Sequence, residues 1–426
     1  MSKINIDFDI AVIGGGSAGM ASAIKAREND ATVVVLEREN KLGGILNQCI
    51  HNGFGLSYFK EELTGPEYAN KFAKKIQETD IDIRLNTTVT NIKKIYNSKQ
   101  VEPYYKITAI SPIGLQNIVV KSIIFSMGCR ERPAGAISLS GSRPSGIISA
   151  GCAQKIVNIY GKSIGKNIVI VGSGDIGLIM ARRLFYEGAN IIGVYEILPY
   201  PSGLKRNIVQ CLEDYNIPLH LSKTVVEVVG KDRVEGVYVA PVKNDFSFDL
   251  EKKEFVPCDT VVLSIGLVPE NELGKTLNLK QNPVTNGAEV DEYLQTSSKG
   301  VFSCGNVLHV HDIVDNVTRE AERAGLNSAL YVKNKLKLGK MLYVNKEQGI
   351  NYVNPTFFYE NEGILTINFR VSKIFHNASI VVLCKNEIIK KIDKKIILPA
   401  EMETVIIQKK DIKSDITIKI ETSEVQ

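Results

Sequence analysis

Two glycine turns of identical spacing constrain this chain more than any other feature. The first lies in DIAVIGGGSAGMASAIKAREND, where an apolar strand is followed by Gly14, Gly16 and Gly19 and then by an alanine-rich helix. In a G-x-G-x-x-G turn, the first glycine permits a tight bend and the second lets the backbone approach a pyrophosphate. The third lets helix and strand pack closely. Because a helix N-terminus offers free N–H groups to phosphates, the spacing predicts a dinucleotide-binding strand, turn and helix.

Each turn is followed by a second apolar strand that ends on an acid. ATVVVLERE ends at Glu37, 23 residues after Gly14, where a carboxylate can accept hydrogen bonds from a ribose. The stretch GKNIVIVGSGDIGLIMARRLFYEG repeats the glycine spacing at Gly172, Gly174 and Gly177. ANIIGVYEI then ends at Glu196, 24 residues after Gly172. Two complete copies favour two nucleotide-binding units over glycine turns without a ligand.

The second acid also bears on the choice of nucleotide. A carboxylate at Glu196 suits a ribose with free hydroxyls and repels a 2′-phosphate, so NAD(H) is favoured over NADP(H). Lys205 and Arg206 follow nine and ten residues later, and a loop could return them to a phosphate. We favour the interpretation that these two are solvated loop charges.

Composition indicates a globular, multidomain protein. The 426 residues suggest two or three domains, and 44% hydrophobic with 23% charged residues is ordinary for such a chain. The net charge is +5, and the chain has no dense stripe of Lys and Arg. The charge therefore does not favour nucleic acid as a partner. Seven scattered cysteines without a C-x-x-C pair, no signal peptide before FDIAVIGGG and no apolar run of membrane length predict a cytoplasmic protein without membrane insertion.

The tail from about Asn345 differs from the rest. ILTINFRVS, ASIVVLCKN, EIIKKIDKKIILP, METVIIQKK and DITIKIE alternate with period two and are rich in β-branched residues. This pattern predicts a small antiparallel β-sandwich. The tail lysines are more typical of a solvated face than of a binding patch: Lys390, Lys391, Lys394, Lys395, Lys409 and Lys410.

The order of these parts resembles the two-dinucleotide-domain flavoproteins of the pyridine nucleotide–disulfide oxidoreductase superfamily. FSMGCRERP stands where that family has an ATG-x-R-P loop, and GVFSCGN stands where it has G-V-F-A-x-G-D. The resemblance covers about residues 5–335. It implies that FAD binds the first turn and NAD(H) the second. Asn306 replaces the family's aspartate, and it can still bond a ribityl hydroxyl, without charge.

The resemblance and the spacings together give an expected architecture and site. The expected fold class is α/β, with two Rossmann-like dinucleotide-binding domains followed by a β-sandwich-like domain. We place the FAD-binding domain at residues 1–150 and 280–340, the NAD-binding domain at 151–279, and the β-rich domain at 341–426. The expected FAD contacts are Gly14, Gly16, Ser17, Ala18, Gly19, Glu37, Arg38, Gly43, Gly44, Val89, Gly128, Gly305 and Asn306. The expected NAD contacts are Gly172, Gly174, Asp175, Ile176, Gly177, Glu196 and Gly266.

The stretch LGGILNQCIHNGFG follows Glu37, where disulfide reductases of this superfamily carry two cysteines five residues apart. Gly43 and Gly44 match the family's double glycine near the FAD pyrophosphate, but only Cys49 is present. A dithiol relay within the chain is therefore not expected. Cys49 could act alone as a sulfenic acid or mixed disulfide, but we favour a small neutral side chain near the flavin. His51 could hand on protons or could be a satisfied loop residue.

Two further candidates, His309 and His311, follow the turn at Gly305. Alternation in LHVHD places both on one side of an extended segment, ahead of a helix expected from about Val314. If that helix points its N-terminus at the flavin, one histidine would lie near the ring, and a structural role is equally compatible. A metal site is not expected, because His-x-His with Asp312 lacks further ligands. Cys129 and Cys304 are interpreted as small buried side chains.

The expected function is hydride transfer between NAD(H) and FAD, with electrons exchanged with an acceptor outside the chain. LGGILNQCIHNGFG, RPSGIISAGCAQ, NIVQCLED and HVHDIVDNVTREAE resemble a bacterial subfamily that accompanies glycerol-3-phosphate dehydrogenase-like flavoproteins. That resemblance implies a second flavoprotein as partner. A self-contained NADH oxidase or peroxidase is the alternative, and a non-catalytic nucleotide-binding subunit is a third possibility.

Overall fold

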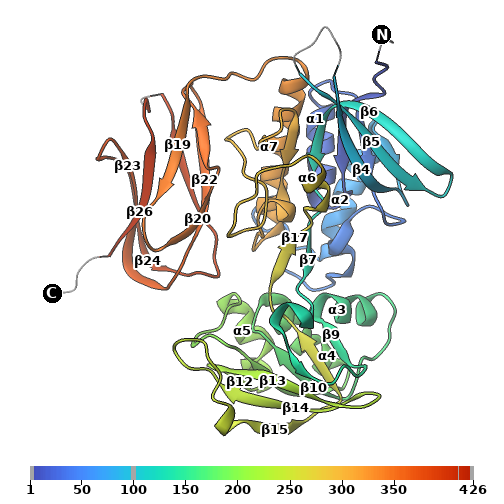
Figure 1. Cartoon of the computed structure of the whole chain (residues 1–426), viewed down its shortest axis with the longest axis vertical. Coiled ribbons are helices and arrows are strands. Elements are labelled where there is room, and N and C mark those ends of the chain that lie inside the picture. Colours follow the sequence, from blue (N-terminus) through green and yellow to red (C-terminus); the bar gives the residue numbers. More distant parts are fainter. Residues whose placement is uncertain (1–3, 97–101, 411, 423–426) are drawn as a thin grey trace. The chain divides into compact units, whose positions relative to one another are not determined.

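The computed structural model describes residues 4–96, 102–410 and 412–422, and it divides the chain into two compact units (Figure 1). Unit 1 consists of Met1–Cys129 and Pro269–Gln426, and unit 2 consists of Arg130–Val268. Where the chain passes between them, β7 (Cys129–Glu131) pairs with β17 (Leu267–Pro269). The domain boundaries expected from the sequence, at residues 150/151, 279/280 and 340/341, stay predictions. The outer ends of the first and last expected domains, residues 1–3 and 423–426, lie outside the described residues.

Unit 1 is built on a seven-stranded sheet. Its order is β3-β2-β1-β6-β5-β4, and β18 also pairs with β6. The strands are β1 (Phe8–Ile13), β2 (Val33–Leu36), β3 (Asp82–Arg84), β4 (Thr88–Ile95), β5 (Tyr104–Ser111), β6 (Gly114–Phe125) and β18 (Val301–Ser303). The parallel strands β1 and β2 are almost wholly apolar because helices cover both faces of such a sheet.

The helices of unit 1 bring distant parts of the chain together. They are α1 (Ser17–Arg27), α2 (Gly65–Gln77), α6 (Glu272–Thr276) and α7 (Val314–Val332), with short 3-10 turns η1 (Gly44–Gln48) and η5 (Gly305–Val307). Figure 1 shows α7 beside α1, and small residues allow this approach. A Cβ at Gly325 of α7 would lie 2.2 Å from the carbonyl oxygen of Ser22 in α1. The start of α7 at Val314 agrees with the sequence pattern.

The tail of unit 1 forms two sheets around a core of its own. One has the order β21-β19-β26-β23-β24 and the other β20-β22-β25. The strands are β19 (Met341–Lys346), β20 (Ile350–Asn354), β21 (Phe357–Tyr359), β22 (Ile364–Val371), β23 (Phe375–Cys384), β24 (Glu387–Ile397), β25 (Glu403–Gln408) and β26 (Ile416–Thr422). All pairs are antiparallel among the described residues except β19 with β26, which is parallel.

One expectation about the tail is wrong. Lys409 was expected on a solvated face, but it is buried, and its Nζ lies 2.5 Å from Oε2 of the buried Glu292. The backbone N–H of Tyr359 donates to the other oxygen of that carboxylate, at 3.0 Å. Alternation along β25 continues into Lys409 and directs its side chain inward, and Glu292 supplies the compensating charge. Lys410, by contrast, is exposed.

Unit 2 repeats the strand order of the first sheet on a smaller scale. Its main sheet runs β12-β11-β10-β16-β9, and a second sheet runs β15-β14-β13-β8. The strands are β8 (Ser140–Gly141), β9 (Ile147–Ser149), β10 (Asn167–Val171), β11 (Asn190–Tyr195), β12 (Leu219–His220), β13 (Lys223–Gly230), β14 (Val234–Pro241), β15 (Glu254–Pro257) and β16 (Thr260–Leu263). The helices are α3 (Ala150–Asn158), α4 (Asp175–Tyr186) and α5 (Lys205–Cys211), with short turns η2 (Ala134–Ile137), η3 (Glu213–Tyr215) and η4 (Leu250–Lys252).

The predicted fold class is confirmed. Both units contain a mainly parallel sheet in which a glycine turn joins the first strand to a helix, and a β-rich domain follows.

No helix among the described residues is both long and apolar enough to cross a membrane.

Candidate functional site

The first glycine turn leaves one side open and closes the other. Gly14 has a φ of +101°, and a Cβ there would lie 2.7 Å from the carbonyl oxygen of Ser126. A Cβ at Gly19 would lie 1.8 Å from the carbonyl oxygen of Gly14, so only glycine lets α1 pack this closely on the turn. At Gly16, the N-cap of α1, no atom lies within 4 Å of the Cβ position. The open side is the one from which a pyrophosphate would approach.

Glu37 lies directly beside this turn. It follows β2 and is buried, and its Oε2 accepts the backbone N–H of Gly15 at 2.5 Å. Its Oε1 accepts the N–H of Glu39 at 2.7 Å. The N–H of Thr87, just before β4, donates to the carbonyl oxygen of Glu37 at 2.8 Å. This bond brings the start of β4, with Val89, to the same edge of the sheet.

The double glycine after Glu37 rests on the turn. The N–H of Gly43 donates to the carbonyl oxygen of Gly15 at 2.9 Å. A Cβ at Gly44 would lie 3.2 Å from Cα of Gly16. The loop that begins LGGILNQCIHNGFG therefore forms a second wall beside the open face of the turn.

A third segment reaches the same place from far along the chain. A Cβ at Gly305 would lie 2.9 Å from Cβ of Ala18, in the first turn of α1. Next to it, Asn306 accepts the N–H of His311 through Oδ1 at 3.0 Å, and its Nδ2 lies 3.7 Å from Sγ of Cys129. The end of the GVFSCGN motif thus adjoins the first glycine turn.

These segments fit a dinucleotide such as FAD. They combine free N–H groups at a helix N-terminus, an approach left open at Gly16, and a buried carboxylate at Glu37. Gly128, after β6, also has no atom within 4 Å of its Cβ position. The other expected contacts lie around the turn, with Ser17 and Ala18 in α1, Val89 half-buried in β4 and Arg38 exposed next to Glu37.

The second turn has the same local construction in unit 2. A Cβ at Gly172 would lie 2.2 Å from the carbonyl oxygen of Ser264, and one at Gly177 would lie 2.7 Å from Cβ of Ser264. Gly174 is the N-cap of α4. The buried Glu196 accepts the N–H of Ser173, within the turn, at 2.9 Å. The helix N-terminus and the buried carboxylate fit a second dinucleotide, but the approach at Gly174 is narrower than at Gly16, because a Cβ there would lie 3.2 Å from Oγ of Ser264.

The segment after Glu196 folds back over this turn. Asp175, at the start of α4, accepts the N–H of Leu204 at 2.8 Å and the side-chain amide of Asn207 at 2.7 Å. Lys205 and Arg206 begin α5 and are exposed. Two further expected contacts complete this region, with Ile176 half-buried in α4 and Gly266 accepting the N–H of Arg132 at 3.1 Å after β16.

Cys49 and His51 each contact a backbone carbonyl that is close in the sequence. The buried Cys49 directs its Sγ at the carbonyl oxygen of Ile45, at 3.3 Å. Nδ1 of the half-buried His51 lies 3.0 Å from the carbonyl oxygen of Asn52, and its ring lies 4.9 Å from that of Phe54. All seven cysteines are free thiols.

Asp315, at the start of α7, fixes the segment that follows His51. Its carboxylate accepts the backbone N–H groups of Gly55, Ser57 and Tyr58 at 2.7–3.0 Å. It also accepts the hydroxyl of Ser57 at 2.8 Å. Sequence reasoning did not identify this residue. The signal was an aspartate in the first turn of a helix, but its partners lie some 260 residues away in the sequence.

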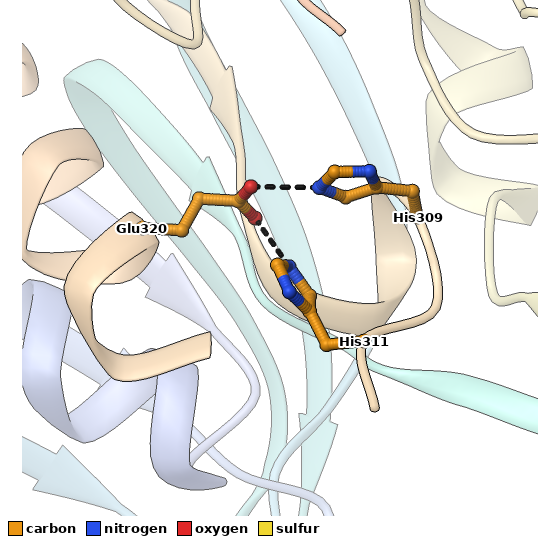
Figure 2. A group of neighbouring side chains, drawn as sticks. All are labelled: His309, His311 and Glu320. Atoms are coloured by element: carbon orange, nitrogen blue, oxygen red, sulfur yellow. Dashed lines mark hydrogen bonds and ion pairs between the residues drawn. The ribbon is translucent and has the colours of Figure 1, made fainter. Parts of the chain in front are cut away.

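His309 and His311 converge on one carboxylate (Figure 2). Nε2 of His309 lies 2.7 Å from Oε2 of Glu320, and Nε2 of His311 lies 3.1 Å from Oε1. The three side chains are between 1% and 3% exposed. Burial by itself raises the pKa of Glu320, but the two imidazoles outweigh it and hold that pKa well below its usual range.

The tail sandwich covers this cluster. Tyr352 and Asn354 of β20 approach His309, with Tyr352 Oη 3.5 Å from Nδ1 and Asn354 Nδ2 3.4 Å from Nε2. Asp312, which was weighed as a metal ligand in the sequence, instead pairs with Arg370 of β22. Arg370 also donates to the carbonyl oxygen of Val310 at 3.0 Å.

The two remaining thiols differ in burial. Cys304 is fully buried, and burial raises the pKa of its thiol, in agreement with an inert small side chain. Cys129 is only partly buried.

Sequence reasoning placed both histidines, His309 and His311, on one side of an extended segment but missed Glu320. The available signal was an acidic residue on the apolar stripe formed by Val317, Ala321 and Ala324 of α7.

Comparison with known families identifies most of the chain. The family profile described as pyridine nucleotide-disulphide oxidoreductase matches residues 8–326. The chain is similar to hydrogen cyanide synthase subunit HcnB of Pseudomonas protegens, with 24% identity over 320 residues, covering 70% of this chain and 65% of HcnB. It is also similar to NADH oxidase of Methanocaldococcus jannaschii, with 26% identity over 318 residues, covering 71% and 64%. The matches thus span less than two thirds of these relatives.

A solved structure supports the fold. The crystal structure of thioredoxin reductase from T. acidophilum aligns with a TM-score of 0.62 and 23% sequence identity. The alignment covers 78% of this chain and 99% of that one. At this level of identity the similarity establishes the fold alone, and the chemistry has to be inferred from the site residues.

Proposed function

Because this chain belongs to the pyridine nucleotide-disulphide oxidoreductase family, we propose that it is an oxidoreductase that binds FAD in unit 1 and NAD(H) in unit 2. The observation that carries the proposal is a matched pair of buried carboxylates. Glu37 and Glu196 each follow the second strand of a parallel sheet, and each accepts an N–H from its own glycine turn. Such a carboxylate can exchange these bonds for ribose hydroxyls.

The bound cofactors would supply hydride transfer between nicotinamide and flavin, and the chain would supply binding and orientation. In unit 1, Gly16, Gly44 and Gly305 would leave room for the dinucleotide, and Asn306 would bond a hydroxyl without adding charge. In unit 2, Glu196 would accept the ribose hydroxyls and repel a 2′-phosphate, which favours NAD(H) over NADP(H).

We further propose that electrons are exchanged with an acceptor outside the chain. Cys49 is the one cysteine in the loop that follows Glu37, and its Sγ contacts a backbone carbonyl within its own turn. Similarity to HcnB, which is named as a subunit, supports a protein partner. The subfamily resemblance of HVHDIVDNVTREAE points to a second flavoprotein, of the glycerol-3-phosphate dehydrogenase-like kind, as that partner.

An anaerobic titration with NADH tests the central claim. The purified chain should carry a flavin whose oxidised absorbance disappears in proportion to added NADH, and NADPH should be less effective. Re-oxidation should be slow with O₂ and fast after addition of the flavoprotein that co-purifies with the chain. A flavin that NADH does not bleach would contradict the proposal. Absence of both flavin and NADH affinity would point to a non-catalytic subunit that keeps only the folds of the nucleotide-binding domains.

A self-contained NADH oxidase or peroxidase is the second candidate. It is favoured by the similarity to a protein named NADH oxidase and by the thiol at Cys49, which could form a sulfenate. In that case the lone chain would turn over NADH rapidly with O₂ or peroxide, and Cys49→Ala would abolish this turnover. If Cys49→Ala leaves reduction of the flavin and turnover unchanged, the thiol has no redox role.

A further inference from the structure

The cluster of His309, His311 and Glu320 has the composition of a metal-ligand set. Its candidate ligand atoms, two imidazole nitrogens and a carboxylate oxygen, all lie within 4.8 Å of one another (Figure 2). These are the atom types that Zn²⁺ and related divalent ions bind. Bonds of about 2.0–2.2 Å to a shared ion would place neighbouring ligand atoms about 3.3 Å apart in a tetrahedron. The present separations of 2.7 and 3.1 Å are slightly shorter, so small side-chain rotations would admit an ion.

The charge of the cluster also calls for a cation. The carboxylate of Glu320 is buried, and among the described residues its ion-pair partners within 4.0 Å are the two imidazoles alone. A buried carboxylate is costly unless a positive charge compensates it. The guanidinium of Arg323 contributes positive charge nearby, and a proton on an imidazole or a bound metal ion would place a positive charge directly at the carboxylate.

The ligands are held in place from outside the cluster. The N–H of Gly305 donates to Oε1 of Glu320 at 2.7 Å, which fixes the carboxylate. The N–H of His311 is held by Asn306, which fixes the loop that carries both histidines. Hydrogen bonds of this kind orient the ligands of metal sites and are part of their design.

A fourth ligand is within reach on the tail sandwich. The buried Asn354 places its Nδ2 3.4 Å from Nε2 of His309, and rotating the amide by half a turn would present its oxygen at the same point. A cavity of about 10 Å³, at the lower limit for one water, adjoins the cluster on the side of His309, Tyr352 and Asn354. Either oxygen would complete a four-coordinate site, the usual arrangement in closed zinc sites.

We propose that His309, His311 and Glu320 bind a divalent transition-metal ion, best matched by Zn²⁺, with Asn354 or a water as the fourth ligand. The ion would join three parts of unit 1, namely the loop after η5, helix α7 and strand β20 of the sandwich. The site adjoins the proposed FAD contacts Gly305 and Asn306, but its ligands are other residues and metal binding is measured without NAD(H), so the two proposals can fail independently.

The test uses the full chain, purified after expression with added ZnSO₄ and dialysed. Elemental analysis should find about one Zn²⁺ per chain, as expected for one closed site. Glu320→Gln and His311→Ala should each retain at least fivefold less. Co²⁺ added to the metal-free protein should give the visible absorption of tetrahedral Co²⁺, at longer wavelength than the flavin bands, and neither variant should show it.

Matched controls distinguish this site from adventitious binding. His376→Ala removes an exposed histidine of β23 and Cys152→Ser removes an exposed thiol, and both should retain the metal. Wild-type chain without retained metal, and with no rise of Tm on adding Zn²⁺, would overturn the proposal, since a ligand of the folded state must raise Tm. Equal retention by wild type, Glu320→Gln and His311→Ala would overturn it as well. The wild-type measurements decide the matter even if both variants fail to fold.

Discussion

The two glycine turns share a local design and differ in what surrounds them. In both, the first glycine (Gly14 or Gly172) lies against a backbone carbonyl, and a buried glutamate accepts an N–H from the turn. The first turn is contacted at Gly44 by the loop that follows its own second strand, and at Gly305 by a segment far along the chain. The second is covered by the stretch around Leu204, which directly follows its own second strand.

This difference suggests how long each nucleotide stays. The local pattern determines what kind of ligand a turn can hold, whereas the remote contacts determine how far the ligand is enclosed. We therefore expect the nucleotide of unit 1 to remain bound through purification and that of unit 2 to exchange freely. Four predictions test the contrast between the two units, from the largest expected effect to the smallest.

Lys409→Met should weaken unit 1 alone. The change leaves the buried carboxylate of Glu292 without its counter-ion, which costs about 3–5 kcal/mol in comparable buried pairs. Denaturant unfolding followed by flavin release should shift to lower concentration, while the hydrogen-exchange protection of amides in unit 2 should not change. Lys410→Met, at an exposed position, should change stability by less than about 0.5 kcal/mol. Equal effects of the two variants would contradict the role assigned to the ion pair.

Gly14→Ala and Gly172→Ala should separate the two nucleotides. Each adds a Cβ within 2.7 Å or 2.2 Å of a backbone carbonyl, at a positive φ. We expect Gly14→Ala to weaken FAD binding at least a hundredfold, about 2.7 kcal/mol, so that the protein is colourless. Gly172→Ala should retain its flavin and lose reduction by NADH. A colourless Gly172→Ala protein would remove the contrast between the turns.

The pH dependence of stability should have opposite sign in the two units. Burial raises the pKa of Asp291 in unit 1 to about 7, so the folded state holds a proton that the unfolded state releases above about pH 4. The free energy of unfolding of unit 1 should fall as pH rises from about 4 to 7, by at most about 1.4 kcal/mol per pH unit. In unit 2, burial alone would raise the pKa of Asp259, but bonds from Asn167, Thr260 and Lys166 lower it. Its contribution is present above about pH 4 and is lost below.

Unfolding curves of unit 1 at pH 5 and pH 8, and of unit 2 at pH 3 and pH 5, would show this opposition. Asp291→Asn should flatten the pH dependence of unit 1 between pH 5 and pH 8 and leave unit 2 unchanged. A slope that persists in Asp291→Asn would assign the effect to another group.

Glu196→Gln should produce the smallest effect. The amide keeps one acceptor oxygen but loses the charge, so KM for NADH should rise about three- to tenfold, or roughly 0.7–1.4 kcal/mol. KM for NADPH should fall or stay constant, because the repulsion of a 2′-phosphate is removed. Rapid reduction assays with both nucleotides measure the change, and flavin content should match wild type. A parallel rise for both nucleotides would argue against contact with the ribose.

Much of the fold could be predicted because its signals are local. The glycine turns, the start of α7 at Val314 and the alternating strands of the tail all depend on residues within a few positions of one another. Lys409 could not be predicted, since a lysine that continues an alternating strand looks like any solvated lysine. Its burial depends on Glu292, more than a hundred residues earlier in the chain.

The candidate site shows the same limit. The expected flavin contacts at Gly14, Gly44 and Gly305 meet because the fold brings three glycine motifs together, and each motif is visible alone. No motif assigned a role to Glu320 or Asn354. They become candidates only when α7 and β20 are placed beside the loop that carries His309.

The pairing of Arg370 with Asp312 and of Lys409 with Glu292 bears on how this protein could have been assembled from parts. Both carboxylates precede the sandwich in the chain, and both find their counter-charges within it. A relative that loses the last 86 residues, or a chimera that receives a foreign tail, would inherit two acids evolved for partners it lacks. Recombination at residue 340 should therefore yield functional proteins only when residues 292 and 312 change together with the tail.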